Sequence, residues 1–176
     1  YQKTQVLRVA ADLRLADLLA AGTRTANELA TATSTSPSTL YRLLRALASL
    51  GLLSEHSTGF ELTPLGSLLR TEQPGSMRAQ ILHQAGDMYS VWAELGYSVE
   101  SGSSAFPKVF GVSNWERREQ HPEVNANFNA AQANNTRLNG TNLAESYPFP
   151  EQGMVVDVGG GNGTLLSLVL SRHPGL

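Results

Sequence analysis

The sequence has no cysteine. That absence excludes disulfides and thiolate metal sites, and it is what we expect of a protein in a reducing compartment such as the cytoplasm. Long apolar runs are also missing, so we expect no transmembrane span and no signal peptide before the first helix. Charge is balanced as well: a net charge of −2 gives no electrostatic reason to expect nucleic acid or an anionic membrane as a partner.

Clusters of metal-ligating side chains are absent too. The four histidines are scattered, with no pair at helical spacing and no acid at ligand spacing, so we expect no metal site. No Ser-His-Asp arrangement and no pair of carboxylates stands out. What remains is a globular composition, in which 41% hydrophobic residues suffice to bury a core.

The first part of the sequence carries helical signals. Apolar residues recur at helical spacing from Val6 to Leu19, and Gly22 ends the pattern. Thr25 and Glu28 then form a capping box, in which each side chain satisfies a free backbone amide of the other residue. A short second helix is therefore expected after this box.

A third helix and two strands follow. Ser36-Pro37 supplies an N-cap and a first helical residue, and the leucine stripe behind it ends at Gly51. We expect short strands at 52–55 and 59–62, and a new helix from Thr63-Pro64. Three helices followed by a two-stranded wing predict a winged helix-turn-helix.

A winged helix can bind DNA or serve as a scaffold for dimerisation. Between residues 23 and 70 the arginines are Arg24, Arg42, Arg45 and Arg70, and the acids are Glu28, Glu55 and Glu61. This segment is nearly neutral, whereas a protein that binds double-stranded DNA needs several cations to neutralise phosphates. The charge therefore favours a scaffold. The outward polar residues of the third helix still allow a role as a small DNA-binding regulator.

The second part reads as helical up to a linker. We expect a helix over 76–101, irregular structure over 102–122, and a helix from Pro122 to Ser146. The Pro- and Gly-rich segment 147–153 marks a domain boundary.

A glycine-rich turn follows this linker. The apolar segment Met154–Val158 predicts a strand that carries Asp157 near its end. Glycines at alternate positions over 159–163 then lead into a helix from Thr164. Strand, glycine turn and helix in this order are typical of a cofactor-binding turn in an α/β domain, where the main chain approaches the ligand closely.

Several motifs in order resemble one family. They are Tyr41-Arg42-Leu43-Leu44-Arg45-Ala46-Leu47, Leu62-Thr63-Pro64-Leu65-Gly66, Trp92-Ala93-Glu94-Leu95, Phe128-Asn129-Ala130-Ala131 and Val156-Asp157-Val158-Gly159-Gly160-Gly161-Asn162-Gly163. Together they resemble the N-terminal half of the caffeate-type O-methyltransferases that use S-adenosylmethionine, and the resemblance covers essentially the whole chain.

The resemblance implies a mainly α chain. It implies a winged helix-turn-helix dimerisation domain at 1–75, a helical connector lining the substrate pocket at 76–150, and the start of a Rossmann-like methyltransferase domain at 151–176. It also implies a homodimer formed through the N-terminal helices, with no role in binding DNA.

The family pattern carries roles over to individual residues. For S-adenosylmethionine it implies Asp157, Gly159, Gly160, Gly161 and Thr136. For the substrate it implies His83, Trp92, Phe128, Gln132 and Asn135. The family often has methionine where this sequence has Gln132, which makes the pocket more polar and argues against a flat phenylpropanoid-like substrate.

The implied activity is methyl transfer to a hydroxyl of a small aromatic or polyketide-like natural product. The ribose-binding acid and the catalytic histidine of the family are expected beyond Leu176, in a longer protein, so no catalytic residue is assigned. Two alternatives stay open at this point: a family member repurposed for hydroxylation or pericyclic chemistry, and a winged-helix dimerisation or regulatory module.

Overall fold

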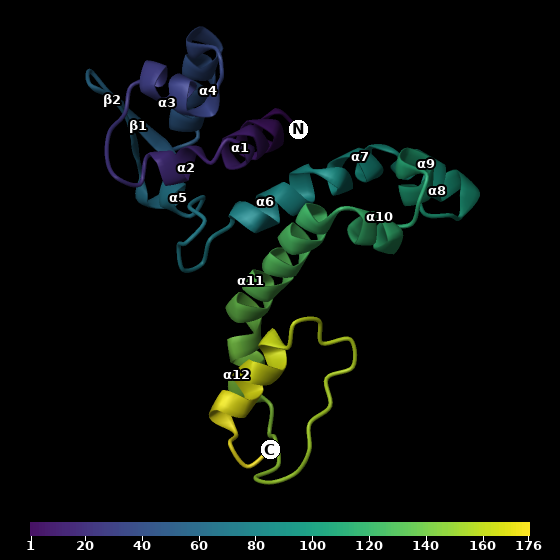
Figure 1. The fold of residues 1–176 in the computed structure, drawn as a ribbon. Coiled ribbons are helices and arrows are strands. Elements are labelled where there is room, and N and C mark those ends of the chain that lie inside the picture. The colour runs from purple at the N-terminus through teal and green to yellow at the C-terminus, as the bar shows by residue number, and fades with distance from the viewer.

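The computed structural model describes residues 1–176 and contains twelve helices and two strands. The elements of the N-terminal domain are α1 (Gln2–Asp12), α2 (Leu15–Leu18), α3 (Ala26–Thr33), α4 (Pro37–Ser49), β1 (Leu53–His56), β2 (Gly59–Leu62) and α5 (Pro64–Ser67). The later elements are α6 (Arg78–Ala85), α7 (Asp87–Ala93), α8 (Leu95–Ser101), α9 (Phe106–Phe110), α10 (Asn114–Gln120), α11 (Pro122–Ser146) and α12 (Thr164–Arg172). The long α11 projects away from the N-terminal domain, and α12 packs beside its far end (Figure 1).

The winged helix-turn-helix predicted from the sequence is confirmed. Thr25 caps α3 as expected, because its hydroxyl accepts from the Glu28 amide while the Glu28 carboxylate accepts from the Thr25 amide at 2.7 Å. Ser36 occupies the N-cap position of α4, but its hydroxyl lies 3.3 Å from the Ser38 hydroxyl and makes no capping bond. The wing is the antiparallel pair β1 and β2, with Leu53 opposite Leu62.

Aliphatic side chains build the core of this domain. The core cluster holds thirteen buried residues, which come from every element between α1 and β2 and from the segments beside them. Leu44 of α4 is 0% exposed, and Phe60 of β2 is 2% exposed with its ring edge-on to Tyr41. Burying such side chains is the main stabilising term for a domain of this size.

Two predicted helices are interrupted. The first helix ends at Asp12, and Arg14 takes a left-handed conformation (φ 53°) before α2 begins. The segment 76–101 forms the three helices α6, α7 and α8 instead of one. Gly86 lies at the first of these breaks, where a Cβ would collide with the carbonyl oxygen of Leu82.

The prediction of irregular structure over 102–122 is wrong. This segment contains α9 and α10, and α10 begins with a capping box between Ser113 and Glu116. Phe106 and Phe110 of α9 pack with ring centroids 5.0 Å apart. Local capping and aromatic packing therefore stabilise helices that the weak apolar periodicity does not indicate.

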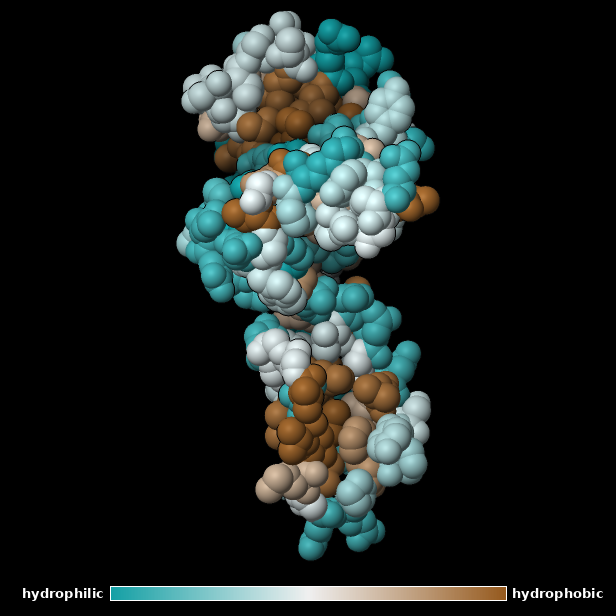
Figure 2. Space-filling model, turned by 90° about the vertical axis from the view of Figure 1, so that its right-hand side faces the viewer, coloured by the Kyte–Doolittle hydropathy of each residue, from teal (hydrophilic) through white to brown (hydrophobic).

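The helix predicted from Pro122 to Ser146 is confirmed as α11, and the linker 147–153 lies outside any helix or strand. None of the helices combines the length and the hydropathy that crossing a membrane requires. Apolar surface nevertheless gathers at two places in Figure 2, over the N-terminal domain at the top and around α11 and α12 at the bottom.

The strand predicted at Met154–Val158 does not form. The segment runs without a paired neighbour, and its apolar side chains are exposed: Met154 by 87%, Val156 by 73% and Val158 by 92%. The physical reason is that a strand of a parallel sheet needs partner strands for its hydrogen bonds. The sheet of the structure is the antiparallel pair β1 and β2, which makes one further bridge, to Arg24, and none to this segment. The glycine turn and the helix behind it, α12, form as predicted.

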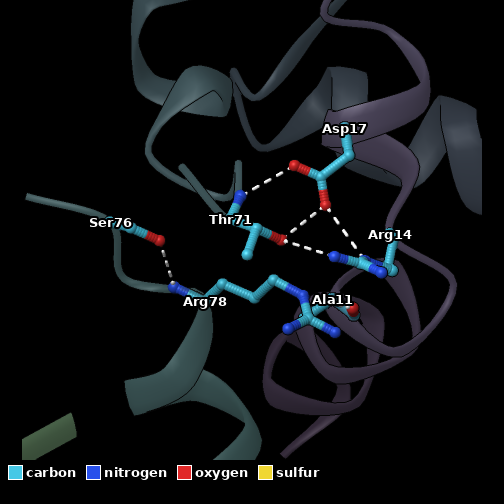
Figure 3. A network of polar contacts seen from close by, with 6 residues as sticks. All are labelled: Ala11, Arg14, Asp17, Thr71, Ser76 and Arg78. Carbon is cyan, nitrogen blue, oxygen red and sulfur yellow. Dashed lines mark hydrogen bonds and ion pairs between the residues drawn. The ribbon is translucent and has the colours of Figure 1, made fainter. Parts of the chain in front are cut away.

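A polar network joins α2 to the segment after α5 (Figure 3). The Asp17 carboxylate accepts from the Thr71 amide at 2.7 Å and from the Thr71 hydroxyl at 2.6 Å, and the Arg14 Nε donates to it at 3.3 Å. In the same region Arg78 of α6 donates to the Ala11 carbonyl at 3.0 Å. Burial alone would raise the pKa of Asp17, but these hydrogen bonds outweigh it and hold the pKa below its ordinary value.

Replacing Asp17 by asparagine (Asp17→Asn) is expected to lower the free energy of unfolding at pH 7 by about 2 kcal/mol, since hydrogen bonds to a charged group are lost. A carboxyl with a lowered folded pKa stabilises the fold above its ordinary pKa of 3.8, and this contribution is lost as pH falls through the folded value. Urea unfolding between pH 2 and 7 should therefore show a weaker acid dependence in the variant. Asp12→Asn, at the half-exposed Arg8 pair, is the control and should change little.

Candidate functional site

A pocket of about 860 Å³ lies where α10, α11 and the glycine turn, residues 157–163, come together. Its lining comprises Trp115 and Arg118 of α10, Asn125, Phe128, Asn129, Gln132 and Thr136 of α11, residues Asp157 and Gly159–Asn162 of the turn, and Thr164 and Leu165 of α12. We call it the glycine-turn pocket. Few of these residues are hydrophobic, so the pocket suits a ligand that carries polar groups as well as an apolar surface.

One face of α11 forms a wall of the pocket. Asn125, Phe128, Gln132 and Thr136 recur every three or four residues, which puts them on the same side of a helix. The predicted substrate residues Phe128 and Gln132 therefore share a wall with the predicted cofactor residue Thr136. Thr136 lies about 12 Å further along the helix axis than Phe128.

The glycine turn forms the opposite side. Gly159 and Gly161 have positive φ angles of 77° and 59°, a conformation that a side chain would strain. The Asp157 carbonyl accepts from the Gly160 amide at 3.4 Å, and the Asp157 carboxylate lies over Gly160, where a Cβ would collide with it. The Asp157 Oδ2 is buried and has no hydrogen-bond partner within the chain, so this acceptor still needs a donor.

Helix packing fixes the position of the turn. At the start of α12 the Asn162 side chain accepts from the Thr164 hydroxyl at 2.6 Å. Gly140 of α11 lets α12 approach closely, because a Cβ there would lie 3.1 Å from Leu165 and 3.3 Å from Leu168. The turn is thus held against the same helix that carries the polar wall.

Arg118 is the cation of the pocket, and sequence reasoning missed it. Only 7% of the surface of Arg118 is exposed to solvent. Its guanidinium carbon lies 3.5 Å from the centroid of the Phe128 ring and 4.8 Å from the centroid of the Trp115 ring. The Nη1 atom is buried without a hydrogen-bond partner. The signal that could have found this residue is the S-x-x-E capping box at Ser113, which puts Trp115 and Arg118 one turn apart on a helix.

His83, a predicted substrate residue, lies behind Phe128. The two rings meet edge-on with centroids 5.3 Å apart, and His83 lines a smaller neighbouring pocket of about 210 Å³ beside Asp87. Burial lowers the pKa of His83, and the charge of Arg118 lowers it further, against the opposing effect of Asp87. His83 therefore contacts the wall of the glycine-turn pocket without lining it.

Two other predicted substrate residues are not brought to this pocket. Trp92 of α7 is 62% exposed. Asn135 is exposed on α11, where its side-chain oxygen accepts from Asn139 at 2.9 Å. Their proposed contact with a substrate stays a prediction. No group of three metal-ligating side chains comes together in the structure.

Known proteins resemble this chain over its whole length. A family model for the O-methyltransferase dimerisation domain matches residues 1–72, and one for the O-methyltransferase domain matches residues 92–176. The O-demethylpuromycin-O-methyltransferase of Streptomyces alboniger is 40% identical over 179 residues, which covers all of this chain and 48% of that protein.

Solved structures show the same architecture. The crystal structure of LaPhzM matches with a TM-score of 0.94 at 39% identity, over 99% of this chain and 53% of that one. NcsB1, an O-methyltransferase of neocarzinostatin biosynthesis, matches with a TM-score of 0.83 at 36% identity, over 100% of this chain and 55% of that one, in complex with S-adenosylmethionine and 2-hydroxy-5-methyl naphthoic acid. The chain spans about half the length of these proteins. The predicted mainly α fold, a winged-helix domain followed by the start of a Rossmann-like domain, is confirmed.

Proposed function

The chain belongs to the O-methyltransferase family that carries an N-terminal dimerisation domain, and from this premise we propose that it serves an S-adenosylmethionine-dependent methyl transfer. The acceptor is a hydroxyl of a small aromatic or polyketide-like natural product. The observation that carries the proposal is the glycine-turn pocket, in which the cofactor turn and the polar face of α11 share one cavity. The curated relatives are named as methyltransferases, which favours this activity over the hydroxylase and pericyclase alternative.

The residues of the turn fit S-adenosylmethionine. Gly159, Gly160 and Gly161 form a cradle without side chains, and the free Asp157 Oδ2 suits the ammonium group of the cofactor's methionine end. The Thr136 hydroxyl would reach the cofactor carboxylate from α11. When bound, the cofactor supplies an electrophilic methyl group on a sulfonium.

The task of this chain is to position the acceptor. In-line displacement needs the acceptor oxygen aligned with the methyl carbon, and alignment in a closed site lowers the barrier by several kcal/mol. Phe128, stacked against Arg118, provides apolar surface at the wall of the pocket, and Gln132 offers hydrogen bonds beside it. His83 supports Phe128 from behind, which keeps that surface in place. No catalytic base is assigned to these residues.

We further propose that the protein is a homodimer and acts in the cytoplasm. An apolar groove of about 360 Å³ crosses the N-terminal domain between α1, the end of α4, α5 and α6, and Leu65 beside it is 53% exposed. An apolar surface of this kind is suited to a second copy of the domain. The winged helix then serves dimerisation at 1–75, ahead of the connector 76–150 and the cofactor segment 151–176.

The proposal is tested with the protein expressed from its complete gene. Wild-type protein is expected to bind S-adenosylhomocysteine in calorimetry and to transfer a labelled methyl group to hydroxylated aromatic acceptors. Thr136→Val should weaken S-adenosylhomocysteine binding about tenfold, because one hydrogen bond to a charged group is lost.

The matched control is Thr141→Val on the same helix, because the Thr141 hydroxyl bonds only the Arg137 carbonyl of its own helix, at 3.3 Å. It should bind the cofactor product as the wild type does. Absence of S-adenosylhomocysteine binding in the wild type would overturn the proposed function. Equal weakening in both variants would remove Thr136 from the cofactor site.

A further inference from the structure

Arg118 is a buried cation without a counter-ion. Its guanidinium lies between the rings of Phe128 and Trp115, and its Nη1 has no hydrogen-bond partner although the residue is only 7% exposed. Leaving a charged donor buried and unpaired is costly for a folded protein. A buried donor of this kind needs a partner, which a water, an ion or a ligand can supply.

The neighbouring arginine shows what a structural partner looks like here. Arg117 donates to Asp87 at 2.6 Å, a half-buried ion pair that joins α10 to α7. Asp87 is therefore occupied, and no acid of the chain forms an ion pair with Arg118. Burial also lowers the pKa of Arg118, as expected for a cation that no counter-ion stabilises.

The geometry favours an anion that enters from the pocket. Stacking on Phe128 holds the planar guanidinium in one orientation, and this leaves its donor edge free to meet a carboxylate with two parallel hydrogen bonds. The guanidinium covers one face of the Phe128 ring, and both residues line the same cavity. An aromatic acid whose carboxylate meets Arg118 would therefore lie in the cavity beside this stacked pair.

We propose that Arg118 binds the carboxylate of the acceptor, and that the substrate class of the protein is a hydroxylated aromatic carboxylic acid. This inference rests on the proposed function. The other available carboxylate is that of the cofactor, which the proposed function gives to Thr136, about 12 Å further along α11 than Phe128. Arg118 lies at the Phe128 end, which favours the acceptor.

The inference is tested by measuring, in a calorimeter, how tightly the protein binds two aromatic acids and the amide that matches each acid. The pairs are 4-hydroxybenzoate with 4-hydroxybenzamide, and 3-hydroxy-2-naphthoate with its carboxamide. Wild-type protein from the complete gene should prefer at least one acid over its amide by about 10- to 100-fold, the range for a hydrogen-bonded charge pair. Arg118→Met should abolish this preference and leave amide and S-adenosylhomocysteine binding unchanged, whereas Arg118→Lys should keep part of it.

Two controls separate binding from structure. Arg137→Met changes an exposed arginine of α11 that donates to Asn134 and does not line the pocket, and it should behave as the wild type. Since Arg118 is an unpaired buried charge, Arg118→Met should hold or raise the melting temperature of the free protein. A fall of several degrees with equal loss of acid and amide binding would make Arg118 a structural residue and overturn the inference.

The two sources of carboxylate give different results. If Arg118→Met weakens S-adenosylhomocysteine instead of the acids, the carboxylate belongs to the cofactor and the acceptor assignment is wrong. If neither ligand responds, Arg118 binds no carboxylate. These outcomes are distinct from failure of the proposed function, because the acids are titrated without cofactor while the wild type is tested separately for S-adenosylhomocysteine binding.

Discussion

Replacing Gly161 by valine (Gly161→Val) is expected to weaken S-adenosylhomocysteine binding by about 100-fold or more. Gly161 has a φ of 59° and its Cβ position is open, so the added side chain strains the backbone and projects into free space. That free space belongs to the cradle of the glycine-turn pocket. The side chain in the cradle and the lost close approach together cost about 3 kcal/mol of binding free energy, which corresponds to about a hundredfold in affinity. Calorimetric titration of the protein from the complete gene measures the change.

Gly102→Val is the matched control. Gly102 ends α8 with a φ of 67°, its Cβ position is equally open, and it does not line the glycine-turn pocket. Both variants should lose similar stability in thermal unfolding, because both carry a β-branched residue in the left-handed region. Only Gly161→Val should lose cofactor-product binding. Equal affinity in the two variants would show that the turn does not hold the cofactor.

Local signals were sufficient to predict much of the N-terminal domain. The capping box at Thr25, the Ser36-Pro37 start and the leucine stripe of α4 each act within a few residues, so they can be read without knowledge of tertiary contacts. The limits of α11 were predicted for the same reason: Pro122 begins the helix, and the Pro- and Gly-rich linker follows it.

Tertiary packing decided the features that were predicted wrongly. The helix breaks at Arg14 and Gly86 let short helices pack on different neighbours, and such breaks leave little trace in apolar periodicity. Residues 154–158 have the composition of a strand, but strand formation depends on partner strands. The two-stranded wing bridges to Arg24 and makes no pair with this segment.

The site was predictable where one element carries it. Phe128, Gln132 and Thr136 share a face of α11 by their spacing alone, and the glycine pattern marks the turn opposite. Arg118 comes from a helix that was not predicted, and its missing partner is a property of the folded structure that no spacing reveals. Trp92 was named as a substrate residue from a family motif, but it does not line the glycine-turn pocket. A motif gives a residue's place in the sequence and not its distance from the pocket.

Replacing Gly66 by alanine (Gly66→Ala) is expected to lower the free energy of unfolding by about 3 kcal/mol, which is large for a single methyl group. Gly66 is buried in α5, and a Cβ there would collide with the carbonyl oxygen of Leu52. That carbonyl is held in place, because it accepts from the Thr63 amide at 3.2 Å and from the Thr63 hydroxyl at 3.1 Å. A backbone atom fixed in this way has no rotamer through which to relieve the contact. Urea or thermal unfolding measures the loss.

Gly96→Ala makes the same chemical change with the opposite expected sign. Gly96 lies in α8 with nothing near its Cβ position, so alanine adds no collision and should raise the free energy of unfolding by about 0.5–1 kcal/mol through its higher helix propensity. The difference between the two variants therefore isolates the collision at Leu52 from the general effect of replacing glycine in a helix. If both variants are stabilised, α5 can shift away from the Leu52 carbonyl. The hydrogen bonds from Thr63 to that carbonyl would then not fix the distance between α5 and Leu52.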